Sequence, residues 1–203
     1  AALAQTAIAG GEPEAGARWA EKALTLDAGN PPSAALRALA AARARERRFG
    51  EGARLLREAL ARDREAGGEH SIATARSLAA LANLYLREER FAEALPLMAQ
   101  AAAIDQRRLG PNHPFIADDF HDLGLIYSAL KRPALARLAF GFAVTVIERG
   151  GGRNTSRMAY AEIELARLSR EAGQNAAADA GLADAKRILA AAAAEERRRQ
   201  RRV

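Results

Sequence analysis

Apolar side chains recur along most of the chain at the spacing of an α-helix. In residues 71–90, Leu78, Leu81, Ala82 and Tyr85 fall at i, i+3, i+4 and i+7 and so share one helix face. Residues 91–110 carry a second stripe, made of Phe91, Ala94, Met98, Ala101 and Ile104. Alanine is abundant and aromatic residues make up only 5% of the chain, which favours closely packed helices over a β-sheet.

This pair of helical patterns repeats every 42 residues. Gly68, Gly110 and Gly152 are 42 apart, and each precedes a helical pattern. A leucine followed by a small residue keeps the same phase, that is, the same position within the 42-residue repeat, in four copies. These are Leu39–Ala40, Leu81–Ala82, Leu123–Gly124 and Leu165–Ala166. The second helices keep phase at Ala59, Ala101, Ala143 and Ala185, and at Leu56, Met98, Phe140 and Leu182. Small residues at fixed places mark close helix crossings, so the sequence predicts an array of helix pairs.

The phase divides the chain into one array of five units. A partial N-terminal unit covers residues 1–30, and further units cover 31–69, 70–111, 112–153 and 154–203. The last unit carries Glu162, Ser169 and Asn175 where earlier copies have large apolar residues. Because a terminal repeat has no successor to pack against, these replacements predict a capping unit with an extended last helix.

Charge and composition narrow the possible partners and location. The net charge is +6, and half of the excess lies in residues 195–203, so the body of the chain is only weakly basic and nucleic acid is disfavoured. There is no cysteine and no apolar run long enough to span a membrane. Since the chain starts at Ala1 and not at Met, we expect a fragment or a processed product. We expect a cytoplasmic protein, with the periplasm as the alternative if a signal peptide has been removed.

One of the three histidines stands in the segment "LGPNHP" between two helical patterns. Pro114 suits the first position of a helix, so Asn112 or His113 is predicted to cap that helix. Ser71 and Thr155 occupy the same phase as His113 and are good capping residues.

Motifs for catalysis are absent from the sequence. It has no G-x-S-x-G, no glycine-rich phosphate loop and no H-E-x-x-H. The acidic residues Asp118, Asp119 and Asp122 beside His121 are interpreted as complementing a helix dipole. The sequence therefore predicts a protein that is not an enzyme, with no catalytic residue, metal, cofactor or small-molecule substrate.

The order of residues within each copy resembles the tetratricopeptide repeat (TPR). The match runs through Leu78, Leu81, Ala82, Tyr85, Phe91, Ala94 and Ala101, and again through Phe120, Leu123, Gly124, Tyr127, Ala136, Phe140 and Ala143, although Pro133 replaces the second-helix aromatic residue. The 42-residue period is similar to that of kinesin light chains and of many bacterial relatives. The resemblance implies an all-α, right-handed superhelical α-solenoid of about five helix-turn-helix repeats that acts as a non-catalytic scaffold for protein–protein interaction.

In that family the first helix of each pair lines a concave groove. Carried over by phase, the candidate groove residues are Arg37, Arg45, Arg76, Asn83, Arg87, His121, Arg167 and Arg170. Arginine outnumbers acidic residues among them, which predicts a peptide segment of another protein, acidic in character, as the ligand. A solvated helix face would give the same pattern.

Two other functions stay open at this point. In the first, the chain is a regulatory or sensor domain of a larger protein; in the second, it binds anionic nucleic acid or membrane through its Arg-rich tail. The pattern makes no prediction of an oligomeric state.

Overall fold

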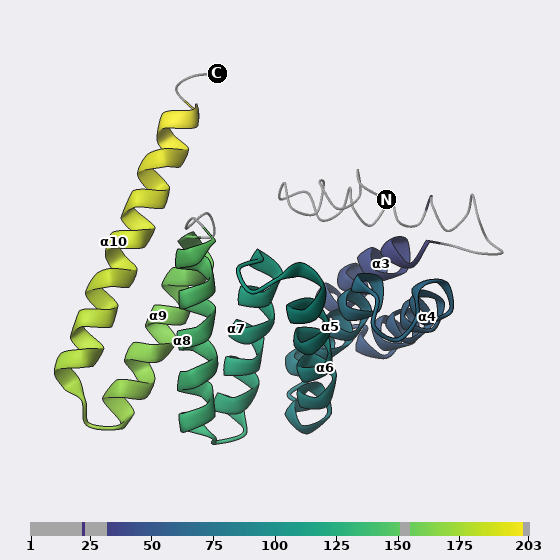
Figure 1. Ribbon diagram of the computed structural model, residues 1–203, viewed down its shortest axis with the longest axis horizontal. Coiled ribbons are helices and arrows are strands. Elements are labelled where there is room, and N and C mark those ends of the chain that lie inside the picture. Colours follow the sequence, from purple (N-terminus) through teal and green to yellow (C-terminus); the bar gives the residue numbers. More distant parts are fainter. Residues whose placement is uncertain (1–21, 23–31, 151–154, 201–203) are drawn as a thin grey trace. The chain divides into compact units, whose positions relative to one another are not determined.

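The computed structural model describes residue 22 and residues 32–150 and 155–200. The expected partial repeat at 1–30 therefore lies outside the described residues, apart from residue 22. Within 32–150 and 155–200 the chain forms eight α-helices and no strand (Figure 1): α3 (Ser33–Arg45), α4 (Phe49–Gly67), α5 (Ile72–Arg87), α6 (Phe91–Leu109), α7 (Pro114–Ala129), α8 (Pro133–Arg149), α9 (Thr155–Glu171) and α10 (Asn175–Gln200). The prediction of an all-α helical repeat fold is confirmed. In this part of the chain no helix is long and apolar enough to cross a membrane.

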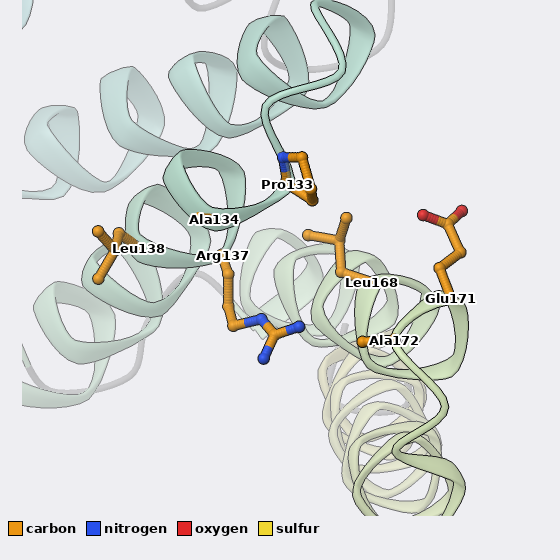
Figure 2. A pocket seen from close by; sticks show the side chains of 7 residues that line it. All are labelled: Pro133, Ala134, Arg137, Leu138, Leu168, Glu171 and Ala172. Atoms are coloured by element: carbon orange, nitrogen blue, oxygen red, sulfur yellow. The ribbon is translucent and has the colours of Figure 1, made fainter.

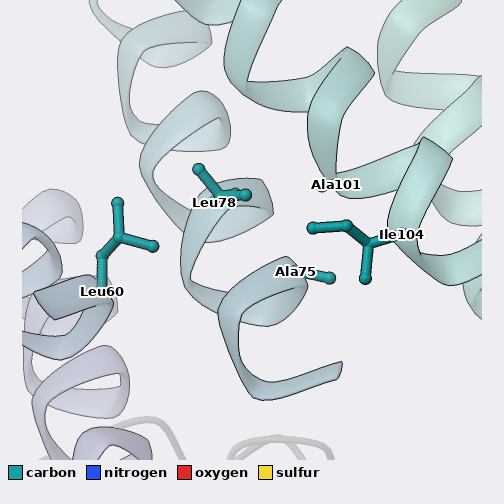
Figure 3. Packing of buried hydrophobic residues seen from close by; sticks show 5 residues of the cluster. All are labelled: Leu60, Ala75, Leu78, Ala101 and Ile104. Carbon is teal, nitrogen blue, oxygen red and sulfur yellow. The ribbon is translucent and has the colours of Figure 1, made fainter. Parts of the chain in front are cut away.

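The chain divides into two compact units, residues 1–104 and residues 105–203. In the first unit, α3 packs on α4, and α4 packs on α5. A core cluster joins α4, α5 and the part of α6 that belongs to this unit, and it consists of Leu60, Ala75, Leu78, Ala101 and Ile104 (Figure 3). Ala75 and Ala101 are completely buried, and their short side chains let α5 and α6 approach closely.

The second unit packs α7 on α8, α8 on α9 and α9 on α10, and these helices lie side by side in Figure 1. Its core is built around Phe140, which is completely buried and clusters with Ala136, Val144, Ala161 and Leu168. The Phe140 ring lies directly over Gly124: a Cβ atom at position 124 would stand 2.6 Å from Cδ1 of that ring. The missing side chain at 124 is therefore what gives the ring its place between α7 and α8.

The phase-derived core positions are buried as the sequence predicted. This holds for Leu81, Tyr85, Ala94, Ala101, Leu123, Gly124, Phe140 and Ala143. Each of these positions faces a neighbouring helix because the apolar stripe and the 42-residue period select the same side of every helix.

The predicted helix caps are confirmed at two of the three positions. The Oγ of Ser71 accepts a hydrogen bond from the backbone N–H of Thr74 (3.1 Å) at the start of α5. His113 caps α7, because its Nδ1 accepts from the backbone N–H of Phe115 (3.2 Å) and Pro114 is the first helical residue. The third position, Thr155, is itself the first residue of α9, and its side chain lies outside the described part.

The turn inside each helix pair has the same geometry in all four copies. Its central residue has a positive φ, at Arg47 (60°), Glu89 (59°), Lys131 (58°) and Gly173 (76°). The next residue donates its backbone N–H to a carbonyl five residues back, for example from Arg90 to Tyr85 (2.9 Å) and from Gln174 to Ser169 (2.8 Å). This left-handed turn satisfies the last carbonyls of the first helix and reverses the chain into the second helix.

Candidate functional site

The first unit has a cleft between α3 and α5, the first helices of two successive pairs. Its volume is about 240 Å³, and it is lined by Arg37, Ala40, Ala41 and Ala44 from α3, by Leu56 from α4, and by Ala80, Asn83, Leu84 and Arg87 from α5. Four of the nine lining residues are alanine, and their short side chains leave the space open. The floor is therefore apolar, and the polar groups of Arg37, Asn83 and Arg87 border it.

Arg37 is held in place by a network beneath the cleft. Its Nη1 donates to Oδ2 of Asp63 (2.7 Å) and to Oγ of Ser77 (3.0 Å), and the Ser77 hydroxyl donates to the same carboxylate oxygen (2.6 Å). Burial lowers the pKa of Arg37 from its ordinary value, and the charge of Asp63 acts in the opposite direction. Since Asp63 and Ser77 are themselves buried, Arg37 connects α3 to α4 and α5, and only part of its guanidinium is available to a ligand.

Asn83 and Arg87 are the available polar groups of this cleft. Asn83 is half-buried and Arg87 is exposed, and neither makes a side-chain hydrogen bond or ion pair within residues 32–150 and 155–200. Arg45, the last residue of α3, is also exposed and has no such partner in the same part of the chain. It lies four residues after Ala41 and so on the same side of α3 as the cleft. An amide that can donate and accept therefore stands beside two uncommitted guanidinium groups.

Acidic residues at the ends of α3 and α5 do not neutralise these arginines. Glu46, which follows α3, receives hydrogen bonds from Arg48 and Arg43, and these lower its pKa. Glu88, which follows α5, is bound by Arg90 (3.2 Å). Arg45 and Arg87 therefore leave a positive charge at this end of the cleft.

Arg76 does not line the cleft. It lies on α5, one helical turn before Ala80, but it is half-buried and already engaged in an interaction. We therefore leave Arg76 out of the ligand-binding set that its phase suggested.

The two candidate residues in α9 border a second cleft, in the second unit. This cleft has a volume of about 260 Å³ and is lined by Ile163, Ala166, Arg167, Arg170 and Glu171 from α9 and Leu182 from α10. The guanidinium of Arg167 contacts Glu164 (2.9 Å), Glu171 (2.5 Å) and the hydroxyl of Ser128 (2.6 Å), and Arg170 contacts Asp179 (2.5 Å). Both positive charges are thus balanced by carboxylates of the same unit, so this cleft is less suited to an acidic ligand.

His121 is buried, contrary to the expectation that it faces the groove. It is only 9% exposed, its ring packs edge-on against Phe140 at 5.5 Å, and its Nδ1 lies 3.4 Å from Oδ1 of Asp122. The phase places the Cα atom of residue 121 on the first helix correctly, but the long imidazole turns toward the Phe140 ring. Across the described residues, no three His, Asp or Glu side chains gather in a way that could hold a metal ion.

Several solved structures share this fold. BtubC (BKLC) from P. vanneervenii is 22% identical with a TM-score of 0.78, over 93% of this chain and 78% of that chain. The putative kinesin light chain from Podosopora anserina, with nearly identical TPR-like repeats, is 22% identical with a TM-score of 0.70, over 94% of this chain and 93% of that chain. The pilF protein of Pseudomonas aeruginosa is 22% identical with a TM-score of 0.70, over 92% of this chain and 73% of that chain. At these identities the likeness shows the fold alone.

Comparison at the level of sequence agrees with the fold. No curated protein matches the chain. The family model described as "Tetratricopeptide repeat" matches residues 32–107 and, overlapping with them, residues 79–149. These matches cover more than half of the chain and span the first three copies of the 42-residue phase, from Leu39 to Ala143. The chain therefore belongs to the tetratricopeptide repeat family.

Proposed function

We propose that this protein is a non-catalytic scaffold that binds an acidic peptide segment of another protein in the cleft between α3 and α5. Proteins of the tetratricopeptide repeat family are in general scaffolds for protein–protein interaction, and the proposal adds the place and the chemistry of the ligand. The observation that carries it is the pairing of an apolar floor with the uncommitted side chains of Asn83, Arg87 and Arg45.

Each of these groups has a distinct role in the proposed complex. The Asn83 amide donates to a backbone carbonyl and accepts from a backbone N–H of the peptide, which fixes an extended segment in register. The guanidinium of Arg87 holds a carboxylate, and Arg45 extends the positive surface for a second acidic residue. Ala41 and Ala80, which are not buried, receive small apolar side chains of the peptide. Arg37 supports the floor through Asp63 and Ser77.

The test is a peptide array that pairs acidic sequences with copies in which Asp and Glu are replaced by Asn and Gln. We expect the parent protein to bind the acidic members preferentially, with binding that weakens as salt is raised because the charges lie at the surface. Arg87→Glu should lose that preference and weaken binding by about tenfold or more, the effect of reversing one charge-assisted contact.

The matched control is Arg54→Glu, which makes the same charge change on α4. Arg54 is exposed, does not line the cleft, and lies 3.9 Å from Glu58. If Arg87→Glu binds the acidic peptides as well as the parent protein, or if Arg54→Glu loses binding to the same extent, the cleft is not the binding site.

A further inference from the structure

The outward face of α8 differs from the same face of the other three second helices. Positions 135, 138 and 142 of α8 carry Leu135, Leu138 and Phe142. At the same phase α4 has Glu51, Arg54 and Glu58, α6 has Glu93, Pro96 and Gln100, and α10 has Ala177, Ala180 and Asp184. The other copies show that the fold does not need large apolar residues here.

These three side chains form an exposed stripe on one helix face. Leu138 is 70% exposed, Leu135 41% and Phe142 37%, and their spacing of i, i+3 and i+7 places them in line along α8. Phe142 is held in position by the ring of Phe120 from α7, at 4.4 Å between centroids. A contiguous apolar stripe of this kind on a surface indicates an interaction site, and its spacing matches that of a packed helix.

A cleft adjoins the stripe and shares Leu138 with it. The cleft has a volume of about 590 Å³ and is lined by Pro133, Ala134, Arg137 and Leu138 from α8 and by Leu168, Glu171 and Ala172 from α9 (Figure 2). Five of the seven lining residues are apolar. In Figure 2 the side chains of Leu168 and Arg137 extend toward the space between the two helices.

Arg137 brings a hydrogen-bond donor with no acceptor to this apolar cleft. Its Nη1 donates to Oε1 of Gln174 (3.2 Å). Its Nε is buried and has no hydrogen-bond partner in the part of the chain that the structure describes. A buried guanidinium donor without an acceptor is costly, and a carboxylate paired with this guanidinium would offset part of that cost.

The charge around the cleft favours an acidic occupant. The Glu171 carboxylate is bound by Arg167 at 2.5 Å, so it does not compensate Arg137. Lys131 and Arg132, which directly precede α8, are exposed. A second copy of the same face would bring these positive charges together, whereas an acidic partner would be attracted to them.

We propose that the α8 surface, made of Leu135, Leu138, Phe142 and the cleft containing Arg137, binds an amphipathic helix of a partner protein. The apolar stripe of that helix packs along α8, one of its side chains fills the cleft beside Leu168, and a carboxylate at its edge pairs with the guanidinium of Arg137. This surface is separate from the α3–α5 cleft in its residues and in the form of its ligand, which is a helix and not an extended peptide.

The experiment titrates a designed helical peptide of about 20 residues, long enough to form a helix with an alanine background, against the full chain by fluorescence anisotropy. The peptide carries leucine at i, i+3 and i+7 with glutamate on either side, and a matched peptide carries glutamine in place of glutamate. We expect the glutamate peptide to bind with a Kd on the order of 100 μM, and the glutamine peptide to bind about tenfold more weakly.

Two variants locate the binding. Leu135→Glu with Leu138→Arg gives α8 the residues that α4 has at the same phase, and because both positions are exposed the fold should persist by circular dichroism. This double variant should lose binding by tenfold or more. Arg137→Gln should reduce the preference for the glutamate peptide, since Lys131 and Arg132 are then the only charges of the surface named above that still distinguish the two peptides. Arg87→Glu should bind the glutamate peptide as the parent does, which separates this proposal from the α3–α5 cleft.

Four results would overturn the proposal. Failure of the parent to bind the glutamate peptide, or equal affinity for both peptides, removes the acidic helix as occupant. Loss of binding in Arg87→Glu but not in the α8 double variant assigns the helix to the other cleft. If sedimentation shows that the parent is a dimer and that Leu135→Glu with Leu138→Arg is a monomer, the occupant is a second copy of this chain.

Discussion

The contact between Gly124 and Phe140 gives the sharpest test of how the 42-residue phase determines packing. In the other three copies the position of Gly124 is alanine and the position of Phe140 is Leu56, Met98 or Leu182. Only the copy with the large ring has glycine. A Cβ atom at 124 would lie 2.6 Å from Cδ1 and Cε1 and 2.8 Å from Cζ of Phe140, which is completely buried and cannot turn aside.

Gly124→Ala should therefore destabilise the protein although alanine is the better helix former. Overpacking costs about 1–3 kcal/mol in general, and a Cβ contact of 2.6 Å places this case at about 2–3 kcal/mol, from which a helix-propensity gain of about 1 kcal/mol is subtracted. The net loss is about 1–2 kcal/mol, equivalent to a fall in Tm of about 3–6 °C for a chain of this size. Gly124→Leu should be worse, because it adds further atoms at the same crossing.

Phe140→Leu should rescue Gly124→Ala. Alone, Phe140→Leu leaves a void and costs about 1–2 kcal/mol. Together, the two changes restore the combination found at Ala40 with Leu56, so the double variant should lie within about 1 kcal/mol of the parent, a coupling of about 2 kcal/mol. The measurement is urea and thermal unfolding of all four proteins by circular dichroism. Additivity of the two single effects to within about 0.5 kcal/mol would refute the packing argument.

Three further predictions concern a turn, a carboxyl group and the network under the cleft. Gly173→Ala should lower the free energy of unfolding by about 1 kcal/mol, because φ is 76° there, whereas Gly141→Ala in α8, with nothing within 4 Å of the added Cβ, should raise the Tm. The pKa of Glu162 is raised by burial and then by two neighbouring carboxylates, so the protonated side chain stabilises the folded state. This stabilisation is lost as the pH rises through the pKa of Glu162 in the folded protein. Glu162→Gln should thus raise the Tm at neutral pH by about 1–2 °C, the scale of one like-charge pair, and the gain should vanish in a melt below pH ~4. Ser77→Ala removes the hydroxyl that donates to buried Asp63 and should cost about 1–3 kcal/mol in urea unfolding, and an unchanged midpoint would mean that the network does not support the fold.

The helical architecture could be predicted from the sequence because the signal is periodic. The same apolar stripe recurs in all four copies, so an atypical residue in one copy does not obscure the pattern that the other three copies show. The caps at Ser71 and His113 could also be predicted, because capping depends on local chemistry and both residues occupy the same position of the repeat. The ring of Phe140 over Gly124 follows from comparing copies, since the glycine marks where a larger side chain lies on the facing helix.

The candidate site was less predictable, because phase fixes the position of a Cα atom but not the partners of its side chain. Arg167 has acidic residues three before and four after it, at Glu164 and Glu171, and that spacing already indicates a neutralised arginine. Arg87 has no acidic residue at such spacing and is available. For Arg37 the partner, Asp63, comes from another helix and gives no local signal.

For the α8 surface the sequence does contain a signal, but that signal cannot be seen in the apolar pattern that the four copies share. Leu135 and Leu138 read as ordinary apolar helix residues when α8 is considered alone. They stand out only against Glu51 and Arg54 at the same phase of α4. A departure from the repeat, and not the repeat itself, indicates the unusual surface.

The left-handed turn shared by the four copies also bears on how quickly the chain folds. Each helix pair is closed by a backbone hydrogen bond across only five residues, as from Arg48 to Arg43 (2.8 Å). The side-chain hydrogen bonds and ion pairs described above join residues no more than about one repeat apart in sequence. The largest separation among them is that between Arg37 and Ser77. Chains dominated by such local contacts have little loop entropy to lose before native contacts form. Folding can therefore begin at any of the helix pairs and spread to its neighbours, and it should be completed in milliseconds or less.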